Sequence, residues 1–348
     1  MDTRDQPQAL GSNGPQTRSR RRPLLWLTTA LVVLGLGGFF LWEREPVCRG
    51  KRLSQWLESL VSSSELDDTK SAEAAIRQIG VRGLPCLLRW IRYEPHTGKG
   101  VFRSLVAKLP PRLRSNRVLY LFMEDKAGRR AAEGEIGLAI LGPQAAPAVP
   151  QLTRLMRRYT STNSSLAALR SLGCVGSAGL PPLIEAAQDR QFPNRSAAVA
   201  TIGMNFRGTN GLPALPVLIR CTGDRDARLA RAAILALGTI NAEPETVIPV
   251  LTNRLHESKP ELRGAAVYAL GSFKSQAAQL VSALREVLER DPDPGVRSEA
   301  VAVAGKFKDQ AAEMVPLLNA ATKDSDQNVR EAANDALRSG RDAARYFD

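Results

Sequence analysis

The chain has 348 residues, of which 43% are hydrophobic and only 5% aromatic, and it carries a formal net charge of +13. A core made mostly of Ala, Leu, Val and Ile favours closely packed helices over an aromatic-rich β-sandwich. The chain has two histidines and four cysteines without a C-x-x-C motif, which excludes a zinc site with three His ligands and a C-x-x-C redox site.

An apolar segment follows a polar N-terminal tail. Residues 1–23 are rich in Arg, Gln, Ser, Pro and Gly without an apolar period, and are predicted to form a disordered basic tail. Residues 24–42 contain no charged side chain, and a helix of this length is long enough to span a bilayer. A cleaved signal peptide is the alternative, but no small-x-small cleavage site follows the apolar run. The sequence therefore predicts an uncleaved transmembrane helix over residues 24–42.

The charges around the apolar segment bear on its orientation. Four Arg residues lie just before it and four Arg or Lys residues lie shortly after it, so the count alone is a tie. A basic tail before a first apolar segment favours a cytoplasmic N-terminus. We therefore expect a single-pass protein of the inner (plasma) membrane, with its N-terminus cytoplasmic and the residues from 43 onward periplasmic.

A short helix is predicted next to the membrane segment. Within residues 43–63, the apolar side chains Leu53, Trp56, Leu57 and Leu60 fall on one face of a helix over 51–61. This juxtamembrane helix is expected to cap the N-terminal end of the structure that residues 64–348 form.

A seven-residue string recurs through residues 64–348 at intervals of 30 to 35 residues. Its clear copies are AAIRQIG (74–80), IGLAILG (136–142), AALRSLG (167–173), AAVATIG (197–203), AAILALG (232–238), AAVYALG (265–271) and EAVAVAG (299–305). Two degenerate copies, SLVAKLP (104–110) and AANDALR (332–338), bring the number of repeats to nine. A nearly constant period of this length is typical of a solenoid of stacked helical hairpins.

Each repeat is predicted to contain two helices. The first helix carries the string, whose last position is most often Gly: Gly80, Gly142, Gly173, Gly203, Gly238, Gly271 and Gly305. Gly in the left-handed conformation commonly ends a helix, so these residues are predicted C-caps. Because Val tolerates that conformation poorly, Val in place of Gly238 or Gly271 should destabilise the protein by about 1 kcal/mol or more. The second helix follows and commonly opens with Pro, as in LPCLLRWI, LPPLIEAA and LPVLIRCT.

Charged residues recur in the last five repeats at fixed distances from the end of the string. An acid stands 14 residues before the last position, at Asp189, Asp224, Glu257, Asp291 and Asp324. In four of these repeats an Arg stands eight residues before it, at Arg195, Arg263, Arg297 and Arg330. With these residues the chain resembles the HEAT repeats, in particular the short bacterial kind of the phycobilisome-lyase type. The resemblance implies an all-α fold, an α-solenoid wound as a right-handed superhelix of about nine HEAT-like hairpins. It also implies that the acids and Arg residues form a ladder between adjacent repeats.

Three kinds of enzyme share this repeat. Deoxyhypusine hydroxylases bind two iron ions through several His-Glu pairs, whereas this chain has the single pair His256–Glu257. HEAT-like DNA glycosylases bind DNA in a basic groove. The net charge of this chain permits such a groove, but a periplasmic solenoid would have no access to DNA. The alternative function is that of a lyase-type enzyme or enzyme subunit. If the solenoid is cytoplasmic, binding of nucleic acid is a further alternative.

Basic residues recur on the predicted second helices of the N-terminal half. We expect the second helices to line the concave side, the usual binding surface of such solenoids. Positions four and seven after the Pro point away from the apolar positions, and they form a predicted basic stripe. Its members are Arg89, Arg92, Lys126, Arg154, Arg157 and Arg220. Such a stripe is often only a solvated face, but it also suits an anionic partner.

These features predict a membrane-anchored HEAT-repeat scaffold or adaptor that binds a protein through its concave face. The sequence contains no catalytic or metal-binding constellation, and we expect no cofactor, no small-molecule substrate and no nucleic acid. The expected partner is a protein of unknown identity, and the basic stripe favours an anionic one.

Overall fold

The computed structural model describes residues 45–62, 66–92, 126–158, 163–307 and 312–338. The chain divides into two compact units, Met1–Glu45 and Pro46–Asp348, and every described residue except Glu45 lies in the second. The predicted tail and the predicted transmembrane helix over residues 24–42 therefore lie outside the described residues. Within the described ranges, no helix is both long and apolar enough to span a membrane.

The described part begins with a small β-hairpin followed by a helix. β1 (Val47–Cys48) pairs antiparallel with β2 (Lys51–Arg52), and α2 (Leu53–Ser62) follows directly. The Trp56 indole Nε1 donates a 3.0 Å hydrogen bond to the carbonyl of Cys48, which ties the hairpin to the helix. α2 corresponds to the predicted capping helix. The hairpin is an exception to the all-α prediction. It was not predicted, because strands of two residues leave no periodicity in the sequence.

The rest of the described chain is a stack in which two kinds of helix alternate. The first helices, which carry the recurring string, are α3 (Leu66–Ile79), α8 (Lys126–Leu141), α10 (Asn163–Cys174), α12 (Arg195–Asn205), α14 (Ala227–Ile240), α16 (Pro260–Leu270), α18 (Pro294–Phe307) and α20 (Gln327–Arg338). The second helices are α4 (Leu84–Trp90), α9 (Val149–Arg158), α11 (Leu180–Gln188), α13 (Leu215–Cys221), α15 (Pro244–Asn253), α17 (Ala277–Arg290) and α19 (Met314–Ala321). Short 3-10 helices join many of them: η1 (Gly80–Gly83), η2 (Gly142–Ala148), η3 (Ser177–Gly179), η4 (Gly208–Ala214), η5 (Arg254–His256) and η6 (Lys274–Gln276).

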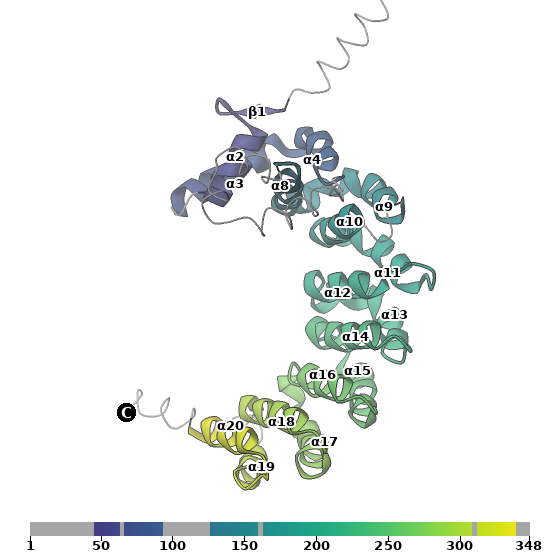
Figure 1. Cartoon of the computed structure of the whole chain (residues 1–348), viewed down its shortest axis with the longest axis vertical. Coiled ribbons are helices and arrows are strands. Elements are labelled where there is room, and N and C mark those ends of the chain that lie inside the picture. Colours follow the sequence, from purple (N-terminus) through teal and green to yellow (C-terminus); the bar gives the residue numbers. More distant parts are fainter. Residues whose placement is uncertain (1–44, 63–65, 93–125, 159–162, 308–311, 339–348) are drawn as a thin grey trace, which may run out of the picture. The chain divides into compact units, whose positions relative to one another are not determined.

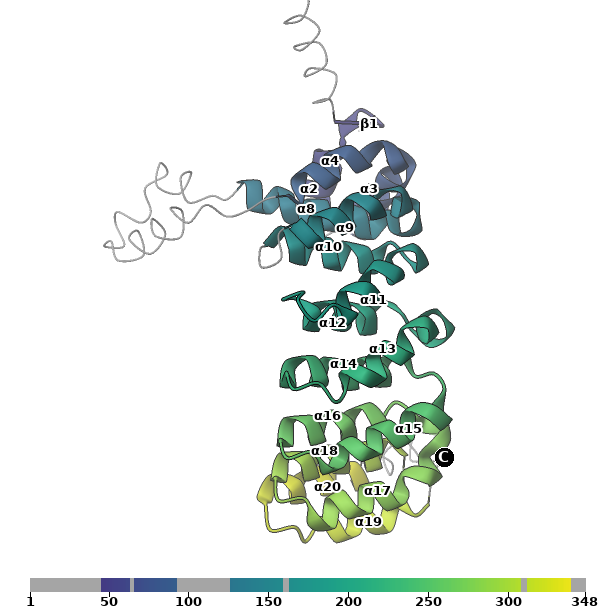
Figure 2. The same ribbon diagram turned by 90° about the vertical axis from the view of Figure 1, so that its right-hand side faces the viewer.

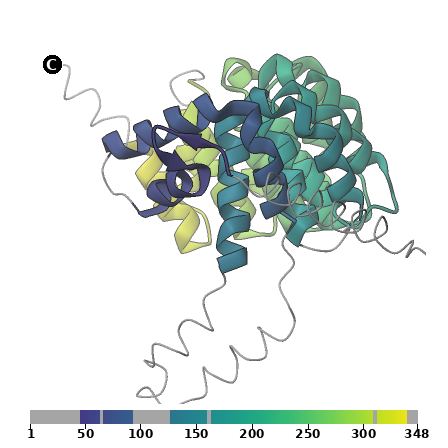
Figure 3. The same cartoon turned by 90° about the horizontal axis from the view of Figure 1, so that it is seen from above.

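The first and second helices form two layers. In Figure 1, α10, α12, α14, α16 and α18 follow one another in one column, and α9, α11, α13, α15 and α17 follow one another beside it; Figures 2 and 3 show the same stack from two other directions. Each first helix packs closely on the next first helix, whereas successive second helices hardly touch. Small, fully buried residues of the string, such as Ala233, Ala266 and Ala300, allow this close approach.

The unequal spacing of the two layers corrects the predicted concave side. Adjacent hairpins that approach closely in one layer and diverge in the other form a bend toward the tighter layer. The first helices are therefore on the inner side of each junction, and the second helices, which were expected to line the concave side, are on the outer side. The sequence does show the reason, since Ala and Gly are concentrated in the first helices.

The hairpins α3–α4 and α8–α9 are direct neighbours. α8 packs on α4, and η1 contacts η2. A Cβ placed on Gly137 of α8 would lie only 2.5 Å from the Leu87 side chain of α4, and the Arg130 guanidinium lies 5.2 Å from the centre of the Trp90 ring. Residues 93–125, which contain the predicted repeat ending at residue 110, lie outside the described residues. The described residues form seven hairpins and the final helix α20.

Most glycines that end the string have a different role from the predicted one. Gly80 and Gly142 directly follow α3 and α8 and have φ angles of 57° and 52°, which is the left-handed conformation of a C-cap. The other glycines have no positive φ and lie within a helix or at its right-handed end: Gly173, Gly203, Gly238, Gly271 and Gly305. A Cβ on Gly238 would lie 2.7 Å from the Cα of Ala269 in the next first helix. These five glycines permit close packing between repeats, and none of them is a left-handed C-cap, although Gly271 is the right-handed C-cap of α16.

An Arg near the start of a first helix binds the acid of the next repeat at three junctions. The pairs are Arg195–Asp224, Arg263–Asp291 and Arg297–Asp324. Arg263 is bidentate, with both N–O distances to Asp291 at 2.7 Å, and it also donates to the carbonyl of Glu257 in its own repeat. Each Arg thus links the loop of one repeat to the loop of the next, which fixes the position of adjacent hairpins.

The ion pairs shift the pKa values of their members. Burial disfavours the charged carboxylate of Asp291, but hydrogen bonds from Arg263 and from the N–H of Asp293 outweigh it and hold the pKa of Asp291 below its ordinary value of 3.8. The hydrogen bond to Asp291 in turn raises the pKa of Arg263. Both groups therefore stay charged at neutral pH.

The ladder is interrupted where the sequence lacks the Arg. The repeat before Glu257 has Ala230 at the Arg position, and Glu257 pairs with Arg254 of its own loop. The repeat before Asp189 has Ser165 at that position, and Asp189 is exposed without a salt bridge to a described residue. The implied ladder therefore runs through three junctions and misses these two.

The acids also shape the turns between helices. At three junctions the ladder acid is followed two residues later by a second Asp: Asp224 and Asp226, Asp291 and Asp293, Asp324 and Asp326. The carboxylate of Asp293 accepts hydrogen bonds from the N–H groups of Gly295 and Val296, which caps α18. Arg330, the last predicted ladder residue, donates to the carbonyls of Asp324 and Ser325 at 2.8 Å and thereby closes the same turn.

Candidate functional site

The predicted basic stripe lies on the outer side of the second helices, which we call the second-helix face. Its exposed members lie on α4, α9 and α13, except Arg92, which is two residues beyond the end of α4: Arg89, Arg92, Arg154, Arg157 and Arg220. Lys126 was expected on a second helix, but it is the first residue of α8, a first helix. The repeat frame that the sequence suggested through residues 93–125 therefore placed Lys126 on the wrong kind of helix.

The N-terminal part of the stripe is denser than the sequence suggested. Arg89 and Arg92 were expected to be separated from Arg154 and Arg157 by one repeat, but α4 and α9 belong to adjacent hairpins. Arg157 Nη2 lies 2.6 Å from Glu185 Oε2 of α11, yet the two side chains are 59% and 61% exposed, so this pair contributes at most about 1 kcal/mol. Arg89, Arg92 and Arg154 form no salt bridge with a described residue.

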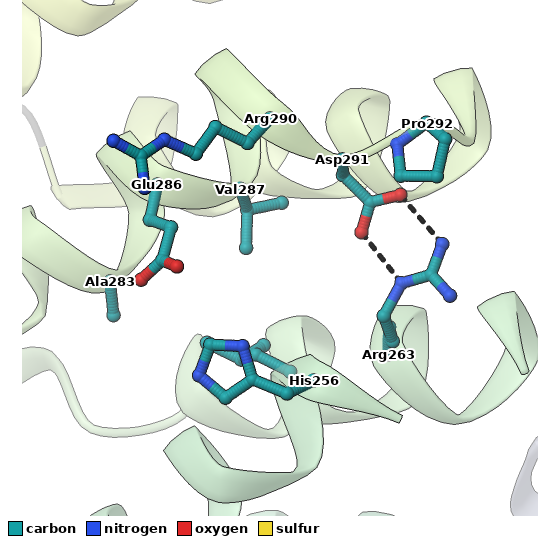
Figure 4. Close-up of a pocket in the computed structure, with 9 residues that line it drawn as sticks. His256, Arg263, Ala283, Glu286, Val287, Arg290, Asp291 and Pro292 are labelled. Atoms are coloured by element: carbon teal, nitrogen blue, oxygen red, sulfur yellow. Dashed lines mark hydrogen bonds and ion pairs between the residues drawn. The ribbon is translucent and has the colours of Figure 1, made fainter. Parts of the chain in front are cut away.

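A crevice opens between second helices where they diverge. Figure 4 shows the one between the end of α15 with η5 and the end of α17, with a volume of about 240 Å³. Glu286 and Arg290 lie at one end, the Arg263–Asp291 pair lies at the other, and His256 lies on the opposite wall (Figure 4). A smaller crevice of about 130 Å³ occupies the equivalent place beside Arg195–Asp224. Because it recurs with the repeat, this crevice is a feature of the ladder junctions and not a specialised site.

Two properties of the described residues bear on catalysis, the clustering of metal ligands and the reactivity of thiols. No group of three or more His, Cys, Asp or Glu side chains among them could hold a metal ion. The four cysteines are free thiols. Burial raises the pKa of the Cys174 and Cys221 thiols, which disfavours the thiolate that a nucleophile needs.

The exposed surface of the first helices lies on the inner side of the stack, and we call it the first-helix face. A groove lies on this face. All of its lining residues come from α14, α16, α18 or the turn before α18, and its volume is about 590 Å³. They are Arg231, Leu235, Pro260, Glu261, Gly264, Ala265, Tyr268, Asp293, Gly295, Val296 and Glu299. We call this hollow the Gly264 groove. Tyr268 is 52% exposed there, in a chain that has only five Tyr residues.

The charges of the Gly264 groove are predominantly acidic. It is lined by three carboxylates and one guanidinium. The carboxylate of Asp293 caps α18, whereas Glu261, Glu299 and Arg231 have no ion pair or side-chain hydrogen bond with a described residue. Unpaired charges in a hollow beside an exposed aromatic ring can bind an oppositely charged group.

The sequence reasoning missed this groove because it assigned binding to the second helices. A signal was nevertheless present. Seven residues before the end of the string, every other repeat has a side chain such as Glu73, Glu135, Arg231 or Glu331, whereas this one has Gly264. Aligning the repeats by that position shows where this first helix lacks the side chain that the other repeats carry.

The family comparison identifies the repeats in the C-terminal part. Residues 180–271 and 248–338 match the family model for HEAT repeats. Residues 180–338, somewhat less than half of the chain, are therefore similar to HEAT repeats, and the N-terminal hairpins continue the same stack. None of the curated proteins compared with the chain matches its sequence.

Solved structures with related architecture are distant. A designed armadillo repeat protein is 19% identical, with a TM-score of 0.40, and the match covers 55% of this chain and 98% of that chain. Kap121p is 14% identical, with a TM-score of 0.48, over 82% of this chain and 37% of Kap121p. Likenesses this distant do not inform function.

Proposed function

We propose that this protein is a membrane-anchored adaptor that binds a protein partner through its first-helix face and has no chemistry of its own. The observation that supports the proposal is the Gly264 groove, an open hollow spanning three first helices with an exposed aromatic ring and unpaired charges. A stack held by bidentate ion pairs between repeats presents such a face with little loss of conformational entropy on binding.

Crosslinking of the intact chain in its native membrane tests the adaptor role. A defined protein recovered with the chain supports it. The competing function is a lyase-type enzyme or enzyme subunit. A cofactor-like absorbance or a retained metal in the purified chain, without a protein partner, would favour that function and contradict the adaptor.

The proposal includes the membrane anchor over residues 24–42, with the N-terminus cytoplasmic and the helical stack periplasmic. Its support is the length of the uncharged segment and the basic tail before it. A reporter that is active only outside the cytoplasm, fused after Asp348, is expected to be active. An inactive fusion together with an active cytoplasmic reporter would contradict this orientation and would favour a nucleic-acid-binding function.

The second-helix face is a second candidate surface, for an anionic partner. Its support is the placement of Arg89, Arg92, Arg154 and Arg157 on adjacent hairpins, where like charges are concentrated. Replacing all four by Glu reverses the local field without touching buried residues, so the fold should persist. Binding to the anionic partner, or to vesicles of anionic lipid, should fall sharply and should be salt-sensitive in the parent.

The matched control is the reversal of Lys323 together with Arg220, the stripe member that lies apart from these four; both are exposed farther along the stack. This variant should keep the binding of the parent. If the fourfold variant captures the same partners at the same salt concentration, the basic stripe is only a solvated surface.

A further inference from the structure

We infer that the Gly264 groove binds an extended, basic segment of the partner protein, with an Arg or Lys side chain placed against Tyr268 and the unpaired carboxylates. The inference rests on the proposed function, because it names the partner chemistry for the same face. It is carried by three features of the groove: a glycine that packing does not require, an exposed ring suited to a cation, and acidic charge without a partner.

Gly264 is not required by the fold. Its φ is not positive, and a Cβ built on it would meet nothing closer than the Val296 side chain at 3.9 Å. By contrast, a Cβ on Gly203 or Gly238, elsewhere in the first helices, would lie within 3 Å of the neighbouring helix. Gly costs about 1 kcal/mol relative to Ala inside a helix. At Gly264 no packing gain in the structure offsets this cost, but the missing side chain opens the hollow and lets a bound chain approach the backbone.

Tyr268 provides a surface for a cation. It lies one helical turn after Gly264 on the same face of α16, and half of its surface is exposed. The ammonium of Lys306, from the next repeat, lies 5.5 Å from the centre of its ring. The ring thus already attracts one cation of the protein itself, and a guanidinium or ammonium of a partner can be attracted to it where the ring borders the carboxylates, away from Lys306.

The carboxylates select the sign of the ligand. Glu261 on α16 and Glu299 on α18 line the hollow, and neither forms an ion pair with a described residue. Arg231 on α14 is the one cation in the lining. The groove is therefore acidic next to Gly264, and a segment with alternating basic and small residues would place a basic side chain against the carboxylates and a small residue over Gly264.

Binding of synthetic peptides to the full chain in detergent tests the inference. The probes are a labelled Arg–Ser repeat peptide and the corresponding Glu–Ser peptide, followed by fluorescence polarisation. The parent should bind the basic peptide and not the acidic one. The double variant Glu261→Gln/Glu299→Gln should weaken binding by about tenfold or more, because two charge-assisted contacts are lost.

The matched control removes the same two charges from the other face of the same repeat. Glu286→Gln/Glu289→Gln on α17 should leave the affinity unchanged, since both side chains are exposed on the second-helix face. Gly264→Leu should abolish binding by filling the hollow while the helical signal and melting temperature are retained. If Glu261→Gln/Glu299→Gln or Gly264→Leu binds like the parent, or if the acidic peptide binds better, the inference is wrong. The adaptor role would still stand if crosslinking captured a partner.

Discussion

Replacing Gly238 by Ala is expected to destabilise the stack by about 2 kcal/mol or more, even though Ala is the better helix former. The added Cβ would lie 2.7 Å from the Cα and 2.9 Å from the carbonyl oxygen of Ala269. These are backbone atoms of the next first helix, which cannot rotate away, so α14 and α16 must separate. Chemical denaturation of the full chain, followed by helical circular dichroism, measures the loss.

Gly264→Ala in the neighbouring first helix is the control for helix propensity. Its Cβ has free space, so the same substitution should stabilise the chain by about 0.5–1 kcal/mol. The two Gly→Ala variants are thus expected to shift the denaturation midpoint in opposite directions. A stabilising effect at both positions would show that the first helices are not in close contact.

Asp291→Asn is expected to destabilise the stack by about 2 kcal/mol or more at pH 7, because the buried guanidinium of Arg263 loses its charged partner. The side chains of Arg263 and Asp291 are only 10% and 4% exposed, so solvent screens the pair little. Asn keeps the oxygen that accepts the N–H of Asp293, but its amide nitrogen replaces the Oδ2 that accepts from Arg263 Nε, so the substitution removes the charge and one hydrogen bond to Arg263.

The effect of Asp291→Asn should depend on pH. The pKa of Asp291 is lowered in the folded state, so its carboxylate stabilises the fold above the unfolded value near 3.8. That stabilisation is lost as the pH falls through the lowered folded pKa, and parent and variant should converge in acid. Asp189→Asn is the matched control. Asp189 occupies the same repeat position and accepts the N–H of Gln191, but it has no Arg across the junction, so its effect should be small at every pH.

Periodicity is what made the architecture predictable. The string and the Pro-opened segments correspond to alternating first and second helices, because Ala-rich faces and Pro at a first helical turn act locally. The Arg–Asp pairs followed from the resemblance to HEAT repeats, since Arg263 and Asp291 recur at fixed distances from the end of the string. Even the interruption at Glu257 could be seen in the sequence, as Ala230 replaces the Arg of the preceding repeat.

The errors concern relations between repeats, which local patterns do not contain. Gly238 follows the last apolar residues of a string whether it ends a helix or contacts Ala269, so the sequence could not separate these roles. The direct contact of α4 with α8 cannot be read from a degenerate string between them. The concave side depends on which layer packs more tightly, and assigning it wrongly drew attention to Arg154 and away from Tyr268.

The central claim is that a protein partner binds the first-helix face, and position-specific photo-crosslinking in the native membrane tests it most directly. A photoreactive residue is placed at Met204 or Tyr268, which are exposed on first helices, and in parallel at Gln151 or Val315, which are exposed on second helices. We expect the first pair to give one discrete protein adduct and the second pair to give none. Adducts formed only from Gln151 or Val315, or no adduct from any position, would contradict the assignment of the first-helix face as the binding surface.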